Sequence, residues 1–439
     1  MGWGQRNGCH CLHVFAVGYG FSRALAPAHA FFCLLLGGLV SIDLYSPFVP
    51  AGIALLALLC ALPLGRFVPL PDSKGRATSI DGLRGLLALG VFVHHSSIWY
   101  VYARSGEWKA PASALYAQLG EAAVALFFMI SAYLFYRQIA SGVTDWTRLY
   151  VGRVLRMLPL YAICVVLLLL LVLIESDFHL VDPLFRFGVG VIQWFSFTVL
   201  GAPDINGVVG TRYIMAGVVW SLPYEWVWYS VLPLLAYFMR QRVRRGLLLL
   251  SALGLAYAAV RLSWVLMLPF VGGVAAYYAT TRMAVVSFLR GKWGSILAAS
   301  CMILSVACFD SARHPAAVVL WSVFFAAIAC GNTLFGLLTL RVSAILGELS
   351  YGIYLLHGFV LFLAYKGLGA VVFADLSPAS YWALTATLLL PLLIACLVSY
   401  RCIELPAMLS RRSVLEKIQV VSEVLIARWR ILLRPERVD

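Results

Sequence analysis

Arg84 and His95 are the residues of this sequence whose types and spacing most clearly indicate chemistry. They lie in an otherwise apolar run, SIDGLRGLLALGVFVHHSSIWY, over residues 79–100. On an α-helix, eleven positions of about 100° each make three full turns plus roughly 20°, so both side chains would share one face, about 16 Å apart. A guanidinium and an imidazole are costly inside a membrane and usually serve a function there. The spacing predicts an intramembrane catalytic site.

His95 is the candidate general base, because an imidazole titrates near neutral pH and can take a proton from a hydroxyl nucleophile. His94 precedes it, and neighbours on a helix point about 100° apart, so only one of the two can lie on the same helix face as Arg84. The alternative for one intramembrane histidine is a structural hydrogen bond to another helix. The arginine on the same face favours a catalytic His95, with His94 lining the cavity.

Glu225 is the candidate catalytic carboxylate, in the segment WSLPYEWVWY about eight residues into a predicted span. An intramembrane carboxylate usually faces a wet cavity or a charged partner. We expect Glu225 to orient His95, to stabilise its protonated form, or to hold a sugar hydroxyl. The aromatic residues around it, such as Trp220 and Tyr224, form either an interfacial belt or a stacking wall for a carbohydrate.

The basic segment RLYVGRVLRMLP begins at Arg148 and supplies candidate donor-binding residues. Arg153 and Arg156 are three positions apart and therefore share a helix face. Paired guanidinium groups suit bidentate binding of phosphate, such as the phosphates of coenzyme A. The alternative is charge that sets topology and contacts anionic lipids.

A second polar stripe occurs in LGELSYGIYLLHGF. Ser350, Tyr354 and His357 recur at helical spacing, and Tyr351 adds a further hydroxyl. These side chains line a cavity or form a hydrogen-bonding seam between helices. Glu121, in the second predicted span, is a further candidate cavity residue. The sequence contains neither the G-x-S-x-G nucleophile elbow of soluble hydrolases nor the glycine-rich Walker A and G-x-G-x-x-G loops of nucleotide-binding proteins.

The composition specifies the class of protein that must position these residues. Of 439 residues, 62% are hydrophobic and 12% are charged, which is typical of a polytopic all-α membrane bundle. The net charge of +14 comes largely from Arg and Lys in short loops, as the positive-inside rule expects, so nucleic-acid binding is excluded. The cysteines are scattered through apolar spans, and the segment 9–13 lacks zinc-ligand spacing, so no metal site is expected.

The apolar runs predict ten core transmembrane helices. Their ranges are 84–101, 120–138, 156–174, 217–239, 245–260, 262–280, 294–309, 316–336, 347–366 and 381–403. With this threading the basic loops all fall on one side of the membrane, which must be the cytoplasmic side.

Three further segments complete the organisation. The stretches 27–43 and 47–65 predict an N-terminal membrane hairpin, and the N-terminus does not resemble a cleaved secretory signal. The run 187–201 is interpreted as an interfacial or re-entrant segment, because counting it as a span would invert every later loop. We therefore expect an N-terminal region (1–78), a core (79–406) and a basic amphipathic tail (407–439), with both termini cytoplasmic.

Between residues 79 and 406 the chain resembles the acyltransferase-3 family of bacterial integral membrane O-acyltransferases. Seven blocks occur in the family's order: IDGLRGLLALGVFVHH, ALFFMISAYLF, YVGRVLRMLPLY, WSLPYEWVWY, FVGGVAAYY, LGELSYGIYLLH and SYRCIELP. The first resembles the family signature of an arginine, ten residues and a histidine. The second block departs from the pattern, with Ala125 where an acidic residue is common and Ala132 where a glycine is common.

The resemblance implies ten core spans and a cytoplasmic acyl donor, usually acetyl coenzyme A, used to modify hydroxyls of envelope glycans. By the same resemblance His95 is the catalytic histidine, Arg84 its active-site partner, and Arg153 and Arg156 hold the donor. Acetyl coenzyme A would be a co-substrate, with no bound cofactor. Direct transfer and an acyl-histidine intermediate both stay open.

The leading hypothesis is therefore an inner-membrane O-acyltransferase whose partners are acyl coenzyme A, a glycan acceptor and the lipid bilayer. The alternative is a transporter or flippase for a glycan or acylated carrier that uses the same polar residues as a pathway. Two features count against the transporter: no half-to-half repeat is visible, and paired arginines at one mouth suit a soluble anionic donor.

Overall fold

The computed structural model describes residues 42–70, 78–142 and 144–432. The segment 9–13 lies outside the described residues, as does nearly all of the first arm of the predicted N-terminal hairpin, 27–43. The second arm is present as helix α2 (Phe48–Leu64), which packs against α13 and α15. Within the described residues the chain is all-α, and its only β-type pairing is an isolated bridge between Ile205 and Val208.

Each of the ten predicted spans falls on a helix. These helices are α3 (Thr78–Ser105), α4 (Ala114–Ala140), α5 (Trp146–Glu175), α7 (Leu222–Phe238), α8 (Arg245–Arg261), α9 (Leu268–Thr280), α11 (Lys292–Cys308), α12 (Pro315–Ala329), α13 (Arg341–Leu368) and α15 (Pro378–Ser399).

Fewer than ten of these helices are long and apolar enough to count as full membrane spans. In the part of the chain that is described, five helices are long and apolar enough to cross a membrane. A sixth qualifies if α10 (Met283–Arg290) and α11, which meet at a 75° bend, are taken as one span. A helix of 17 residues is about 26 Å long, somewhat less than the hydrocarbon core of a bilayer. The protein is a membrane-compatible helical bundle, and the count of ten spans stays a prediction.

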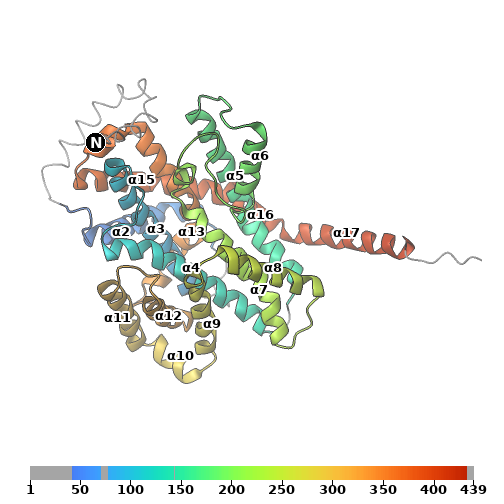
Figure 1. The fold of residues 1–439 in the computed structure, drawn as a ribbon. Coiled ribbons are helices and arrows are strands. Elements are labelled where there is room, and N and C mark those ends of the chain that lie inside the picture. Colours follow the sequence, from blue (N-terminus) through green and yellow to red (C-terminus); the bar gives the residue numbers. More distant parts are fainter. Residues whose placement is uncertain (1–41, 71–77, 143, 433–439) are drawn as a thin grey trace, which may run out of the picture.

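The long helices α3 and α13 form the centre of the bundle, side by side (Figure 1). Small residues allow this close approach: a Cβ added to Gly85 on α3 would lie 2.7 Å from the Cβ of Leu346 on α13. Helix α4 packs against α3, and α9 and α12 pack against α4. Helices α7 and α8 pack against each other, with α7 also touching α4.

The predicted interfacial segment 187–201 is a short helix followed by turns. Helix α6 (Leu184–Phe195) has 12 residues, which is too short for a bilayer span. The chain then forms two 3₁₀ turns, η1 (Thr211–Met215) and η2 (Val218–Ser221). We call residues 211–221 the inserted segment, because it enters the core of the bundle.

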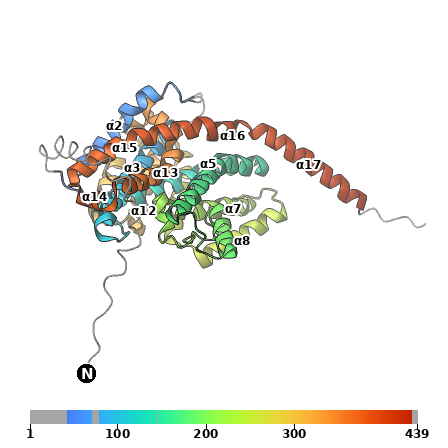
Figure 2. The same cartoon turned by 90° about the horizontal axis from the view of Figure 1, so that it is seen from above.

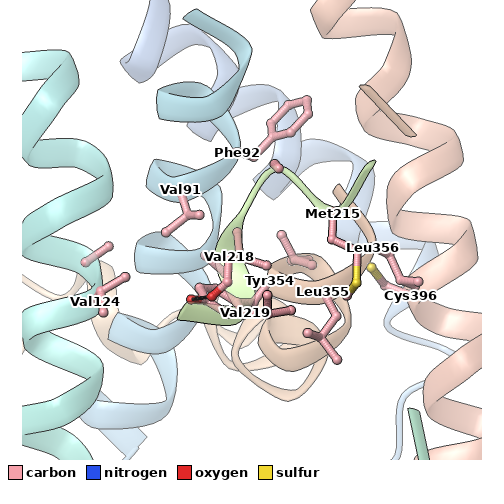
Figure 3. Close-up of a cluster of buried hydrophobic side chains, with 14 of the residues drawn as sticks. Val91, Phe92, Val124, Met215, Val218, Val219, Tyr354, Leu355, Leu356 and Cys396 are labelled. Atoms are coloured by element: carbon pink, nitrogen blue, oxygen red, sulfur yellow. Dashed lines mark hydrogen bonds between the residues drawn. The ribbon is translucent and has the colours of Figure 1, made fainter. Parts of the chain in front are cut away.

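The inserted segment packs against α13 and α5. Figure 3 shows Met215, Val218 and Val219 between Val91 and Phe92 on one side and Leu355 and Leu356 on the other. Met215, Val218 and Val219 are all buried. Most of this segment is buried within the protein, which is where non-helical backbone is tolerated in a membrane protein.

The inserted segment also corrects the fourth predicted span, 217–239. Helix α7 begins only at Leu222, because Gly210, Ala216 and Gly217 adopt left-handed backbone conformations with φ of 77°, 52° and 72°. Such residues interrupt an α-helix. Trp220 therefore lies on a 3₁₀ turn before the helix.

The C-terminal part of the chain is one long continuous helix. Helix α15 passes through a π-helical turn (Tyr400–Glu404) and α16 (Leu405–Leu409) into α17 (Arg411–Leu432). Helix α17 touches α5 near its start and then extends away from the bundle (Figure 2). The predicted tail is thus helical as far as the structure describes it, and its place on the cytoplasmic membrane surface stays a prediction.

Candidate active site

Five helices, α3, α4, α5, α7 and α13, together with the inserted segment, enclose a cavity of about 140 Å³. We call it the arginine cavity, after Arg84, Arg153 and Arg156, which all line it. Seven residues that the sequence singled out meet there although they lie far apart along the chain: Arg84, Arg153, Arg156, Glu225, Ser350, Tyr351 and Tyr354.

The three guanidinium groups make the cavity cationic. Arg153 lies over the Phe135 ring, 4.8 Å from its centroid. The Nη1 of Arg156 lies 3.9 Å from a carboxylate oxygen of Glu404, whose side chain is fully buried. The lining itself carries three guanidinium groups and one carboxylate, that of Glu225, so it has a net positive charge. Guanidinium groups hold phosphates with bidentate geometry. The cavity can therefore take an anionic ligand.

Glu225 faces the same cavity from α7. Its Oε1 lies 3.3 Å from the Ser131 hydroxyl, and its Oε2 accepts a hydrogen bond of 2.8 Å from the Tyr229 hydroxyl. The sequence placed Glu225 about eight residues into a span; in the structure it occupies the first turn of α7, because this helix begins only at Leu222. The partial positive charge of a helix N-terminus favours a carboxylate there.

His95 is paired with His357 on α13. The Nδ1 of His95 lies 3.2 Å from the Nε2 of His357. Each ring also places its own Nδ1 near a carbonyl one turn earlier, Val91 at 3.0 Å for His95 and Ile353 at 2.9 Å for His357. A carbonyl oxygen only accepts, so each Nδ1 carries the proton. The Nε2 of His357 can then accept from His95, and the Nε2 of His95 keeps its lone pair and is the basic atom.

The histidine pair adjoins the arginine cavity through Tyr354. The Tyr354 and His357 rings lie 6.5 Å apart between centroids, and Tyr354 lines the cavity. The Tyr354 hydroxyl is held by the Ser221 hydroxyl at 2.8 Å and donates to the Val218 carbonyl at 2.9 Å. The inserted segment thus fixes the ring that stands between the cavity and the two histidines.

Tyr351 and Ser350 are held by backbone carbonyls at the cavity wall. The Tyr351 hydroxyl donates to the Met157 carbonyl at 2.7 Å, which joins α13 to α5. The Ser350 hydroxyl donates to the Gly347 carbonyl within its own helix, at 2.7 Å. Both side chains therefore shape the cavity wall and make it polar. The hydroxyl proton of each is already donated to a backbone carbonyl.

Two predicted residues lie away from the cavity. His94 faces α4, where its Nδ1 lies 2.7 Å from the Tyr116 carbonyl and its ring packs directly on Gly120. This matches the structural alternative for one of two adjacent histidines. Arg148 lies at the exposed start of α5, where its backbone N–H bonds the carboxylate of Asp145, the N-terminal cap of the helix.

Three others gather near a smaller cavity of about 20 Å³ beside the loop before α12. Glu121 and Trp220 line it, and Glu121 binds the Nε of Arg313 at 3.1 Å and the backbone N–H of Ala312 at 3.1 Å. The Tyr224 hydroxyl accepts from the backbone N–H of Ser263 at 3.1 Å. Glu121 therefore holds the loop before α12 in place and does not line the arginine cavity.

Three residues hold Arg156 and Glu225 in ways that the sequence did not predict: Glu404, Ser131 and Tyr229. Tyr229 was counted only among the aromatic residues around Glu225, and the other two were assigned no role. Glu404 gave a usable signal, because it is a carboxylate inside the apolar block SYRCIELP. Ser131 gave none, since serine is common in membrane helices, and the aromatic cluster around Tyr229 did not indicate its hydrogen bond to Glu225. Among the described residues no group of three or more His, Cys, Asp or Glu side chains could hold a metal ion.

Comparison with known proteins agrees with this geometry. Residues 78–401 match the acyltransferase-3 family model, which describes an acyltransferase domain. Neither the curated proteins nor the solved structures gave a match. The family match covers most of the chain and contains the arginine cavity and the histidine pair. The protein therefore belongs to the acyltransferase-3 family and is a membrane acyltransferase.

Proposed function

We propose that the protein transfers an acyl group, most simply acetyl, from cytoplasmic acyl coenzyme A to a hydroxyl of a carbohydrate or envelope glycan at the bacterial inner membrane. The observation that carries this proposal is the arginine cavity, which adjoins a histidine pair with one basic nitrogen. The cavity suits an anionic donor, and the histidine suits activation of a hydroxyl.

Arg84, Arg153 and Arg156 hold the phosphates of the donor. Arg84 lies near the beginning of α3, and His95 lies about 16 Å further along the same helix. The pantetheine arm of coenzyme A extends over that distance and brings the thioester toward His95. Arg84 in this arrangement positions the donor, because it is too far from His95 to contact the reacting carbonyl.

The Nε2 of His95 acts as the general base. It takes the proton as the acceptor O–H bond breaks, and the acceptor oxygen forms a bond to the thioester carbonyl carbon. The C–S bond then breaks, and the leaving thiolate takes the proton from the imidazolium. The products are the acyl ester and free coenzyme A, so atoms and charge balance. The Nε2 of His357 stabilises the imidazolium by accepting a hydrogen bond from the Nδ1–H of His95.

A matched pair of substitutions on α5 tests the donor site. Arg153→Gln removes a charge that faces the arginine cavity, and Arg148→Gln removes the same charge from the exposed start of the helix. A hydrogen bond to a charged group contributes about 1.5–3 kcal/mol. We expect Arg153→Gln to weaken acetyl coenzyme A binding by at least tenfold in calorimetry on the purified protein, and Arg148→Gln to change it less than threefold.

Equal losses in the two variants would show that phosphate binding depends on general surface charge and not on the cavity. Absence of acetyl coenzyme A binding by the unsubstituted protein would overturn the assignment of the donor.

A further inference from the structure

The C-terminal helix runs antiparallel along the start of α5, which carries two of the cavity arginines. Helix α5 packs against the π-helical turn, α16 and the beginning of α17 (Figure 2). The Nη1 of Arg156 lies 3.9 Å from a carboxylate oxygen of Glu404 and 3.1 Å from the sulfur of Met408. One turn earlier on α5, Gly152 faces Arg411. Glu404, Met408 and Arg411 follow at helical spacing, so they share the face that packs on α5.

The guanidinium of Arg411 lies one helical turn outside the arginine cavity. A Cβ added to Gly152 would lie 3.5 Å from the Nη1 of Arg411, so the glycine lets this group rest close to the backbone of α5. Gly152 precedes Arg156 by four residues, which is a rise of about 6 Å. Arg156 lines the cavity. The loop-charge threading assigns the start of α5, and with it Arg411, to the cytoplasmic side.

The charge of Arg411 has no acidic partner in the part of the chain that the structure describes. Its side chain forms no ion pair or hydrogen bond there, and the residue is exposed. The next residue differs, because the Nε of Arg412 lies 3.0 Å from a carboxylate oxygen of Glu416. Arg411 therefore offers a free guanidinium beside a cavity that suits an anionic donor.

Coenzyme A carries two kinds of phosphate group. Its diphosphate joins the pantetheine arm to the 5′ position of a ribose, and a phosphate monoester occupies the 3′ position of the same ribose. A phosphate monoester has a second pKa of about 6, so it carries nearly two negative charges at pH 7. Because both groups sit on one ribose, they are separated by a short step, comparable with one helical turn.

We propose that Arg411 binds the 3′-phosphate of coenzyme A while the cavity arginines hold the diphosphate. This inference rests on the proposed function and adds to it a subsite that selects the donor. The subsite favours coenzyme A thioesters over thioesters of carriers that lack a 3′-phosphate. Arg411 lies beyond the residues that match the family, so the selection depends on the C-terminal helix of this chain.

The test compares two donors on the purified full-length protein. Calorimetry gives the Kd of acetyl coenzyme A and the Kd of acetyl-3′-dephospho-coenzyme A. We expect the unsubstituted protein to bind acetyl coenzyme A about fivefold more tightly, near the upper limit for a solvent-exposed charge pair. Arg411→Gln should abolish this preference by weakening the binding of acetyl coenzyme A alone. An unchanged Kd for the dephospho donor shows that the variant is folded.

Two further variants separate a specific contact from general charge. Arg412→Gln removes the same charge from a side chain that is 92% exposed and paired with Glu416, so it should keep the preference. Arg411→Lys should keep part of the preference, because lysine binds phosphate as a point charge without the bidentate geometry. Added salt should reduce the preference of the unsubstituted protein, since exposed charges are screened.

The possible failures are distinguishable. If the unsubstituted protein binds both donors equally tightly, the subsite is wrong and the assignment of the donor stands. An unchanged preference in Arg411→Gln, or an equal loss in Arg411→Gln and Arg412→Gln, would also overturn the role of Arg411. If Arg411→Gln instead lowers the Tm only in nanodiscs of anionic lipid, the guanidinium binds lipid headgroups and not the donor. If neither donor binds, the proposed function itself fails.

Discussion

At the scale of single residues, two histidines 262 positions apart make one unit. The helical spacing of Arg84 and His95 could be predicted from the sequence, because α3 is continuous through both residues. His357 was recognised only as part of a polar stripe. Its contact with His95 depends on the packing of α3 against α13, and no local pattern encodes that register. The same holds for Glu404, whose position beside Arg156 depends on a π-helical turn.

The contact between the histidines predicts a positioning role for His357. His357→Leu removes the acceptor of the His95 Nδ1 proton, so the imidazolium loses stabilisation and the ring loses its orientation. We expect kcat for acyl transfer to fall by about 10²-fold or more, a typical loss for impaired general-base catalysis. The KM for acetyl coenzyme A should change little.

The conservative variant His357→Gln supplies a side-chain oxygen that can accept the same proton. It should recover a measurable part of kcat, and the pH dependence of kcat should differ between the two variants. If His357→Leu keeps full kcat and an unaltered pH profile, the contact between the two histidines does not contribute to catalysis.

At the scale of elements, the inserted segment is the part that sequence reasoning described least well. The apolar residues from position 217 onward predicted one continuous span. Pro223 did not fix where the helix begins, because proline is tolerated throughout the first turn of a helix. Ala216 and Gly217 adopt left-handed backbone conformations and break the helix instead. The sequence pattern does not reveal this break, because the break depends on the space that α13 leaves for a turn at Gly358. A hydropathy pattern reports burial, and it does not distinguish a helix from a buried turn.

Gly358 provides that space and therefore a prediction. A Cβ at this position would lie 2.3 Å from the carbonyl carbon of Met215, so Gly358→Ala must displace the inserted segment. Such overpacking costs about 1–3 kcal/mol. We expect a lower Tm in detergent and lower transfer activity, because Tyr354 loses its bond to Val218.

Gly367→Ala is the matched control on the same helix, since no atom lies within 4 Å of its added Cβ. Its activity should equal that of the unsubstituted protein, and its Tm should be equal or slightly higher, because alanine favours a helix over glycine. Equal behaviour of the two alanine variants would mean that the inserted segment moves freely and does not fix Tyr354.

At the scale of the whole molecule, the arginine cavity and the histidine pair lie along the central helix α3. The arginine cavity collects positive charge near the beginning of α3, and His95 lies about 16 Å further along the same helix. Hydropathy was sufficient to predict a helical membrane bundle, and the orientation that the loop charges give it stays a prediction. Neither pattern could predict which helices enclose which cavity, because close contacts such as Gly85 against Leu346 decide that arrangement.

The most direct test of this account is acyl transfer across a sealed membrane. Radiolabelled acetyl coenzyme A, which does not cross a bilayer, is added outside inverted inner-membrane vesicles whose cytoplasmic face points outward. Native cysteines report the orientation: the threading places exposed Cys402 on the cytoplasmic side and exposed Cys308 on the other, so an impermeant maleimide should label only Cys402 of these two. Serine variants of each identify the labelled residue.

The account predicts that acetyl label accumulates on glycan inside vesicles that carry the unsubstituted protein, and that His95→Ala vesicles with the same protein content accumulate none. Equal accumulation in the two preparations would contradict it.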